Sequence, residues 1–100
     1  MGKRINDEKT DFLFGGILKL ETLDGCYDFF EDLCTKTELR EMSKRLWAAK
    51  MISEGEKYSV IVEKTGLSTA TITRVNGCYR DGSGGYVNIL NKLSGKKSDN

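Results

Sequence analysis

The stretch from Tyr58 to Arg80, YSVIVEKTGLSTATITRVNGCYR, limits most strongly what this chain can fold into. Gly66 stands where a tight turn between two short helices needs a residue that adopts a positive φ easily. The core-type residues around it fall at helical spacing, and they are Ile61, Thr65, Leu67, Ile72 and Val75. We expect these positions to pack two helices against each other, so the stretch predicts a helix-turn-helix.

The second predicted helix begins after Ser68, because a serine hydroxyl suits the N-cap position. Its outward positions carry short and mostly polar side chains, namely Thr69, Ala70, Thr73, Asn76 and Gly77. A helix that enters the major groove of DNA needs such side chains near its N-terminal end, where hydroxyl and amide groups reach base edges. We expect Thr69, Ala70 and Thr73 to face bases. The alternative is a purely structural helical hairpin with a serine cap.

Two N-terminal segments, about residues 7–20 and 23–34, have the apolar periodicity of helices. The first carries Phe12, Leu13, Phe14, Ile17, Leu18 and Leu20, although two adjacent glycines interrupt it. The second is expected to be capped by Thr22. So many apolar groups on a short terminal helix indicate burial against a partner chain. Packing of this helix on its own domain is the alternative.

A longer helix is predicted to start at Thr35 and to end at Gly55. Thr35 and Glu38 have the spacing of a capping box, and a glycine is common just beyond a helix end. Its apolar stripe comprises Leu39, Met42, Leu46, Ala49 and either Ile52 or Ser53, and it is widened by Trp47 and Met51. We interpret its charges as a solvated face with pairs such as Glu41–Arg45.

The C-terminal part predicts a glycine-rich turn and a short closing helix near residues 86–93. The glycine run is a weak match to a phosphate loop, because no strand precedes it and no GK[ST] follows. We expect a single domain, residues 1–100, in which 7–57 are dimerisation helices, 58–80 the helix-turn-helix and 84–94 the closing helix. We expect residues 1–6 to be frayed and 95–100 to be disordered.

Composition argues against several kinds of site. The chain has no histidine, and its cysteines, Cys26, Cys34 and Cys78, lack metal-ligand spacing, so we expect neither a metal site nor an enzyme. The acids of residues 24–32 are expected to form a solvated face.

The sequence also bears on where the protein is found. An odd number of cysteines suits reduced thiols, and neither a membrane span nor a signal peptide is visible, so we expect the protein in the cytoplasm. The net charge of +1 is not strongly basic, but a local patch matters more than the sum.

The segments DFFEDLCTKTELREMSKRL and TGLSTATITRVN, together with the order of helices, resemble the Trp-repressor-related family of the YerC/YecD kind. The resemblance covers about residues 20–93. It implies an all-α homodimer with intertwined N-terminal helices, in which each subunit presents one helix-turn-helix to successive major grooves. The implied function is sequence-specific binding of double-stranded DNA in transcriptional control.

The resemblance also implies an effector pocket. In the Trp repressor, tryptophan sits between two arginines that Arg45 and Arg74 match, and a threonine matches at Thr35. Val75 stands where the repressor has glycine, and Cys78 stands where it has a serine that accepts from the ligand amine. These two departures predict that tryptophan is not the effector. Arg45 and Arg74 still suit a small anion.

Phosphate contacts need basic or hydroxyl groups near the predicted recognition helix. The first helix of the motif has Ser59 and Val62 where the family has basic residues, so we expect these contacts from Lys64, Ser68, Arg74 and Arg80. The sequence therefore predicts a dimeric DNA-binding regulator, a repressor, that needs no cofactor. The near-neutral charge favours the alternative, a helical dimeric protein-interaction module that has lost DNA binding.

Overall fold

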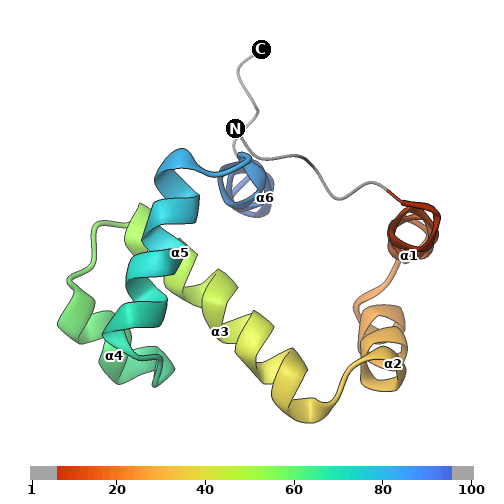
Figure 1. The fold of residues 1–100 in the computed structure, drawn as a ribbon, viewed down its shortest axis with the longest axis horizontal. Helices are drawn as coiled ribbons and strands as arrows, with labels where there is room; N and C mark the ends of the chain where they lie inside the picture. Colours follow the sequence, from red (N-terminus) through yellow and green to blue (C-terminus); the bar gives the residue numbers. More distant parts are fainter. Residues whose placement is uncertain (1–6, 96–100) are drawn as a thin grey trace. The chain divides into compact units, whose positions relative to one another are not determined.

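The computed structural model describes residues 7–95, which contain six α-helices and no strand (Figure 1). The prediction of an all-α chain with about six helices is confirmed. The chain divides into two compact units, Met1–Leu39 and Arg40–Asn100. The predictions for residues 1–6 and for the tail beyond residue 95 lie outside the described residues.

The first unit contains α1 (Glu8–Ile17) and α2 (Leu23–Leu33). Asp7 caps α1, since its side chain accepts from the backbone N–H of Thr10 at 2.8 Å, and this hydrogen bond lowers the pKa of the exposed Asp7 carboxyl. Thr22 caps α2 as predicted by accepting from the N–H of Gly25 at 2.9 Å. Helix α1 ends earlier than expected, because turn-type bonds follow it, from the N–H of Leu20 to the carbonyl of Ile17 for example.

Residues 7–39 include no buried side chain. Phe12 is 86% exposed, Leu18 is 83% exposed and Leu23 is 74% exposed. A helix pair with this much exposed apolar surface does not bury enough area to be stable alone in water, because helical stability in proteins comes mainly from packing. The first unit therefore exposes large apolar side chains on both of its helices.

Helix α3 (Lys36–Ser53) begins with the predicted capping box. The backbone N–H of Thr35 donates to Oε1 of Glu38 at 2.8 Å, and the N–H of Glu38 donates to Oγ1 of Thr35 at 3.0 Å. The apolar stripe predicted for this helix is only partly right. The helix buries Ala48, Ala49 and Met51, whereas Met42 and Trp47 are exposed.

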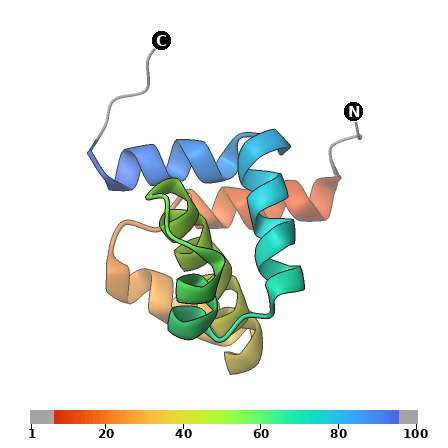
Figure 2. The same ribbon diagram turned by 90° about the vertical axis from the view of Figure 1, so that its left-hand side faces the viewer.

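The second unit also holds α4 (Tyr58–Thr65), α5 (Thr69–Asp81) and α6 (Gly85–Leu93). Helix α5 contacts both α4 and α6, and Figure 2 shows α6 turning sharply away from the end of α5. All five predicted core positions of the helix-turn-helix are buried, and they join α3 residues in one core: Ala48, Ala49, Met51, Ile61, Thr65, Leu67, Ile72 and Val75. This core fixes α5 on the rest of the unit.

Candidate nucleic-acid interface

The turn between α4 and α5 has the predicted chemistry. Gly66 has a φ of 74°, a left-handed conformation that a residue with a Cβ adopts only with strain. The preceding Thr65 is buried, and its hydroxyl donates to the carbonyl of Ile61 at 2.7 Å. The same oxygen accepts from the backbone N–H of Leu67 at 3.1 Å. These two hydrogen bonds fix the path of the backbone from the end of α4 to the start of α5.

Ser68 caps α5 as predicted. Its Oγ accepts from the backbone N–H of Thr71 at 3.1 Å and donates to Oγ1 of Thr71 at 3.1 Å. The hydroxyl of Ser68 is therefore engaged within the turn in both roles, so it must release Thr71 before it can donate to a phosphate. The backbone N–H groups of the first turn of α5 are the more direct anion donors at this end.

The residues expected to face bases lie together on the first two turns of α5. Thr69, Ala70 and Thr73 are exposed, and Thr69 and Thr73 share one helical face because they are four positions apart. Arg74 and Arg80 on the same helix are also exposed. The arrangement puts small, polar side chains at the N-terminal end of α5 and guanidinium groups further along it.

Asn76 differs from its predicted outward position. Its Nδ2 donates to the hydroxyl of Tyr58 at 3.0 Å in a partly buried hydrogen bond. Its Oδ1 is buried and has no hydrogen-bond partner among the described residues. The spacing of α5 did not reveal this contact, because Tyr58 lies on another helix, 18 residues away.

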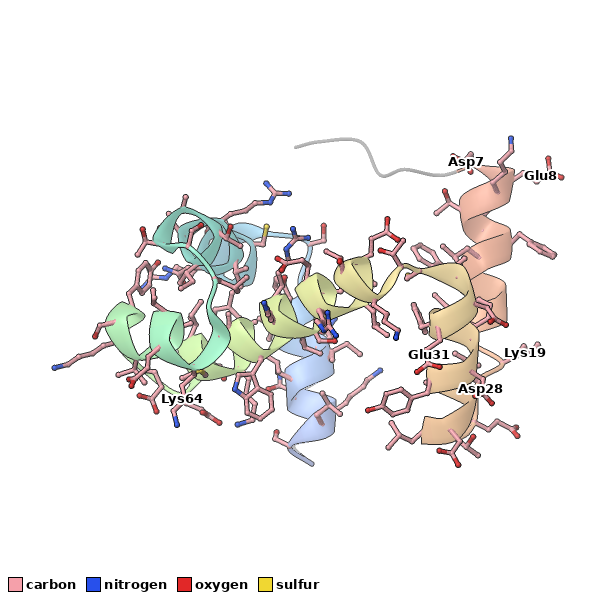
Figure 3. The ribbon with its side chains drawn as sticks, turned by 90° about the horizontal axis from the view of Figure 1, so that it is seen from below. Asp7, Glu8, Lys19, Asp28, Glu31 and Lys64 are labelled. Atoms are coloured by element: carbon pink, nitrogen blue, oxygen red, sulfur yellow. The ribbon has the colours of Figure 1, made fainter. Side chains whose placement is uncertain are left out.

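Lys64 lies in the last turn of α4 and is exposed. Figure 3 shows its side chain extending on the side of α4 that faces away from α5. The side chain of Lys64 therefore points away from the helix that carries Thr69 and Thr73. A phosphate bound by Lys64 would be a different one from those beside α5.

Charge divides unevenly between the two units. Residues 7–39 contain three Lys and Arg against nine Asp and Glu, whereas residues 40–95 contain nine Lys and Arg against five Asp and Glu. The near-neutral total therefore conceals an excess of positive charge on the unit that carries the helix-turn-helix. An anionic partner is favoured by this local excess.

The predicted effector residues belong to both units: Thr35 to the first, and Arg45, Arg74 and Cys78 to the second. The Thr35 hydroxyl is used as the cap of α3, while Arg45, Arg74 and Cys78 are exposed. Val75 is only 2% exposed and belongs to the core. The expected partner of Arg45, Glu41, lies instead 3.6 Å from Nζ of Lys44.

A groove of about 680 Å³ runs between α3 and α6, and sequence reasoning missed it. Its apolar lining comprises Leu46, Trp47, Tyr79, Val87, Leu90 and Leu93. The Nζ of Lys50 lies 4.8 Å from the ring centroid of Trp47 and 2.8 Å from a carboxylate oxygen of Glu54. The half-exposed Trp47 and the exposed Leu93 make this groove an apolar surface open to solvent.

Other kinds of site find no support in residues 7–95. Within this part of the chain, no group of three or more acidic or sulfur-bearing side chains is placed to hold a metal ion. Nor does any helix there have the length and apolar character needed to cross a bilayer.

A tight Gly66 turn, a capped second helix and a shared apolar core define an all-α protein of the helix-turn-helix class. Residues 8–94 match the model of the family described as Trp repressor protein. This chain belongs to the Trp repressor family, as its sequence resemblance predicted.

Three relatives support this assignment. The Bacillus subtilis (strain 168) protein YerC, described as uncharacterized, is 41% identical over 90 residues, which are 90% of this chain and 86% of YerC. The crystal structure of a TrpR-like protein from Eubacterium eligens ATCC 27750 is 45% identical, with a TM-score of 0.82 over 88% of this chain and 91% of that one. A Staphylococcus aureus structure described as a putative Trp repressor is 40% identical, with a TM-score of 0.87 over 94% of each chain.

Proposed function

We propose that this protein is a sequence-specific DNA-binding regulator of transcription that acts as a homodimeric repressor. The observation that carries the proposal is the exposed N-terminal face of α5. Thr69, Ala70 and Thr73 stand there on a helix whose other side is anchored in a buried core. Side chains of this size and polarity suit the edges of bases in a major groove.

Positive charge supports the same proposal. Residues 40–95 carry an excess of Lys and Arg, and Arg74 and Arg80 follow the base-reading residues along α5. Phosphate contacts from these groups would position the helix, while contacts from Thr69, Ala70 and Thr73 would specify the sequence. The first-turn N–H groups of α5 and the Lys64 ammonium would add further phosphate contacts.

The homodimer is the second part of the proposal. Helices α1 and α2 expose large apolar side chains, and the α3–α6 groove exposes another apolar surface. A second copy of the chain would cover both kinds of surface. Two subunits would then present two copies of α5, as recognition of two half-sites requires.

A small anion is the effector that the residues favour. Arg45 and Arg74 are exposed guanidinium groups, and a pair of such groups suits a carboxylate or a phosphate. The relatives are bacterial, and a regulator of this kind acts where the chromosome lies, so the cytoplasm is part of the proposal.

Selection from a random pool of double-stranded DNA is the direct test. We expect enrichment of a sequence with two related half-sites, and we expect Thr73→Ala to change which sequence is enriched. A lost base contact should reduce discrimination at one position by ~1–3 kcal/mol. By contrast, Lys64→Ala should weaken all sequences about equally and should make the salt slope shallower by about 1. Lys92→Ala, on the exposed surface of α6, is the matched control for the loss of a charge.

The alternative, a protein-interaction module without DNA binding, is favoured by the apolar α3–α6 groove. A salt titration separates the two functions. Binding through several phosphate contacts weakens steeply as salt rises, whereas an apolar protein contact responds little. If no sequence is enriched and retention on DNA does not change with salt, the interaction module becomes the better account.

A further inference from the structure

We infer that Tyr58 and Asn76 form a positioning pair that sets the angle at which α5 presents its base-reading residues. The inference rests on the proposed DNA-binding function and adds two residues to it. Neither residue needs to touch DNA for this role. The observation that carries it is the hydrogen bond between Nδ2 of Asn76 and the hydroxyl of Tyr58.

The bond joins two helices at a distance from the turn that already connects them. Tyr58 is the first residue of α4, about 10 Å along that helix from Thr65, and Asn76 is about 10 Å along α5 from Thr69. A shift of about 1 Å at this distance corresponds to a rotation of about 6°. Base recognition needs side chains placed to within roughly 0.5 Å. The apolar core and the turn already join the two helices, and a directional hydrogen bond at this distance adds a constraint on the angle of α5 that apolar packing does not supply.

The start of α4 is held by packing and by this hydrogen bond, and not by a side-chain cap. Its N-cap residue, Lys57, makes no side-chain cap hydrogen bond. The ring of Tyr58 packs against the core, and its hydroxyl reaches α5. The pair therefore fastens the uncapped end of α4 to the middle of α5.

The amide of Asn76 carries a free-energy penalty that an apolar side chain would not have. Its Oδ1 is buried without a partner among the described residues, and a buried unpaired acceptor destabilises a fold. An apolar side chain of similar shape would avoid this penalty and would retain the packing. A group that specifies orientation, rather than stability, accounts for an amide at this position.

The experiment compares Tyr58→Phe, Asn76→Leu and the double variant with wild type. Each is measured for binding to the selected DNA sequence and to a scrambled duplex of equal length, at several salt concentrations. Tyr86→Phe is the control, because that ring also packs against the core. We expect Tyr58→Phe to reduce the ratio of the two affinities by about five-fold, with an unchanged salt slope. Tyr86→Phe should leave the ratio within about two-fold.

The double variant separates positioning from stability. We expect its thermal midpoint to equal or exceed that of wild type, because both polar partners are replaced by apolar groups, while its discrimination stays reduced. Unchanged discrimination in both Tyr58→Phe and the double variant would overturn the inference. So would an effect of Asn76→Leu that is equally large in the Tyr58→Phe background, since Asn76 would then act on the DNA itself.

A second measurement does not depend on DNA. Amide residual dipolar couplings report the orientation of α4 relative to α5 in the free protein. We expect one shared orientation in wild type and in Tyr86→Phe, and a changed or averaged one in Tyr58→Phe. Identical couplings in all three proteins would overturn the inference. If the wild type selects no DNA sequence and Tyr58→Phe nevertheless changes the couplings, only the proposed function fails.

Discussion

The hydroxyl of Thr65 donates to the carbonyl of Ile61 at 2.7 Å, one turn earlier in α4. Because the same oxygen accepts from the N–H of Leu67 beyond the turn, Thr65 joins the end of one helix to the approach to the next. It is the one buried polar side chain among residues 7–95. The helix-turn-helix thus depends on a hydroxyl as well as on its apolar core.

Thr65→Val should test this dependence. Valine keeps the shape of the side chain but leaves the N–H of Leu67 without its acceptor, so we expect a loss of ~1–3 kcal/mol in the free energy of unfolding. Urea titration measures it. Thr37→Val is the control, because Thr37 is exposed on α3, and its effect should stay within about 0.5 kcal/mol. Equal effects of the two substitutions would remove Thr65 from this role.

Stability should depend on protein concentration. If a second copy covers the exposed apolar side chains of α1 and α2, folding and association are linked, and the thermal midpoint rises with concentration. Leu18→Asp should lower the midpoint and the dimer fraction in analytical ultracentrifugation, because Leu18 is 83% exposed in the single chain. Lys19→Asp, at the neighbouring exposed position, should change both much less. A monomer mass with a midpoint independent of concentration would contradict the homodimer.

Tryptophan should not bind as an effector. An indole beside Arg74 would have to displace Val75, which is buried with the core, and overpacking of this kind costs ~1–3 kcal/mol. Cys78 is in addition a weak acceptor for an ammonium group. Calorimetry with millimolar tryptophan should show no saturable heat, whereas Val75→Gly with Cys78→Ser should gain binding if the pocket is otherwise intact. Micromolar binding by the wild type would show that these residues leave the pocket open.

The cap of α1 should be sensitive to pH. The hydrogen bond from the N–H of Thr10 lowers the pKa of the exposed Asp7 carboxyl below its ordinary value of 3.8. A carboxyl with a depressed pKa stabilises the folded state above the ordinary value, and this contribution is lost as pH falls through the lowered pKa. We expect the amide signal of Thr10 to shift in that acidic range in nuclear magnetic resonance spectra. Asp7→Asn keeps an acceptor and should remove the shift.

Local chemistry made much of the fold predictable. The capping box of Thr35 and Glu38, the cap at Ser68 and the positive φ of Gly66 each depend on residues within a few positions, and the structure has all of them. The five core positions of the helix-turn-helix followed from helical spacing around one glycine, and all five are buried. Structural features that depend only on neighbouring residues can therefore be predicted from the sequence.

Long-range contacts account for what was missed. Spacing identifies an apolar stripe on α3, but the neighbouring helices decide which side is covered, so Ala48 is buried while Met42 is exposed. Asn76 was expected to face outward because its helix position allows it, and only the fold reveals Tyr58 as its partner. The α3–α6 groove arises from residues about 40 positions apart, which no local pattern joins.

The exposed apolar side chains of α1 and α2 affect how quickly a newly made chain would be degraded. A subunit without a partner would expose Phe12 on α1 and Leu23 on α2, and segments with few buried contacts are those that open locally and are cleaved by cellular proteases. Pairing would hide the same segments. Chains made in excess of their partners would therefore be degraded, and the amount of regulator in the cell would follow the amount assembled and not the amount translated.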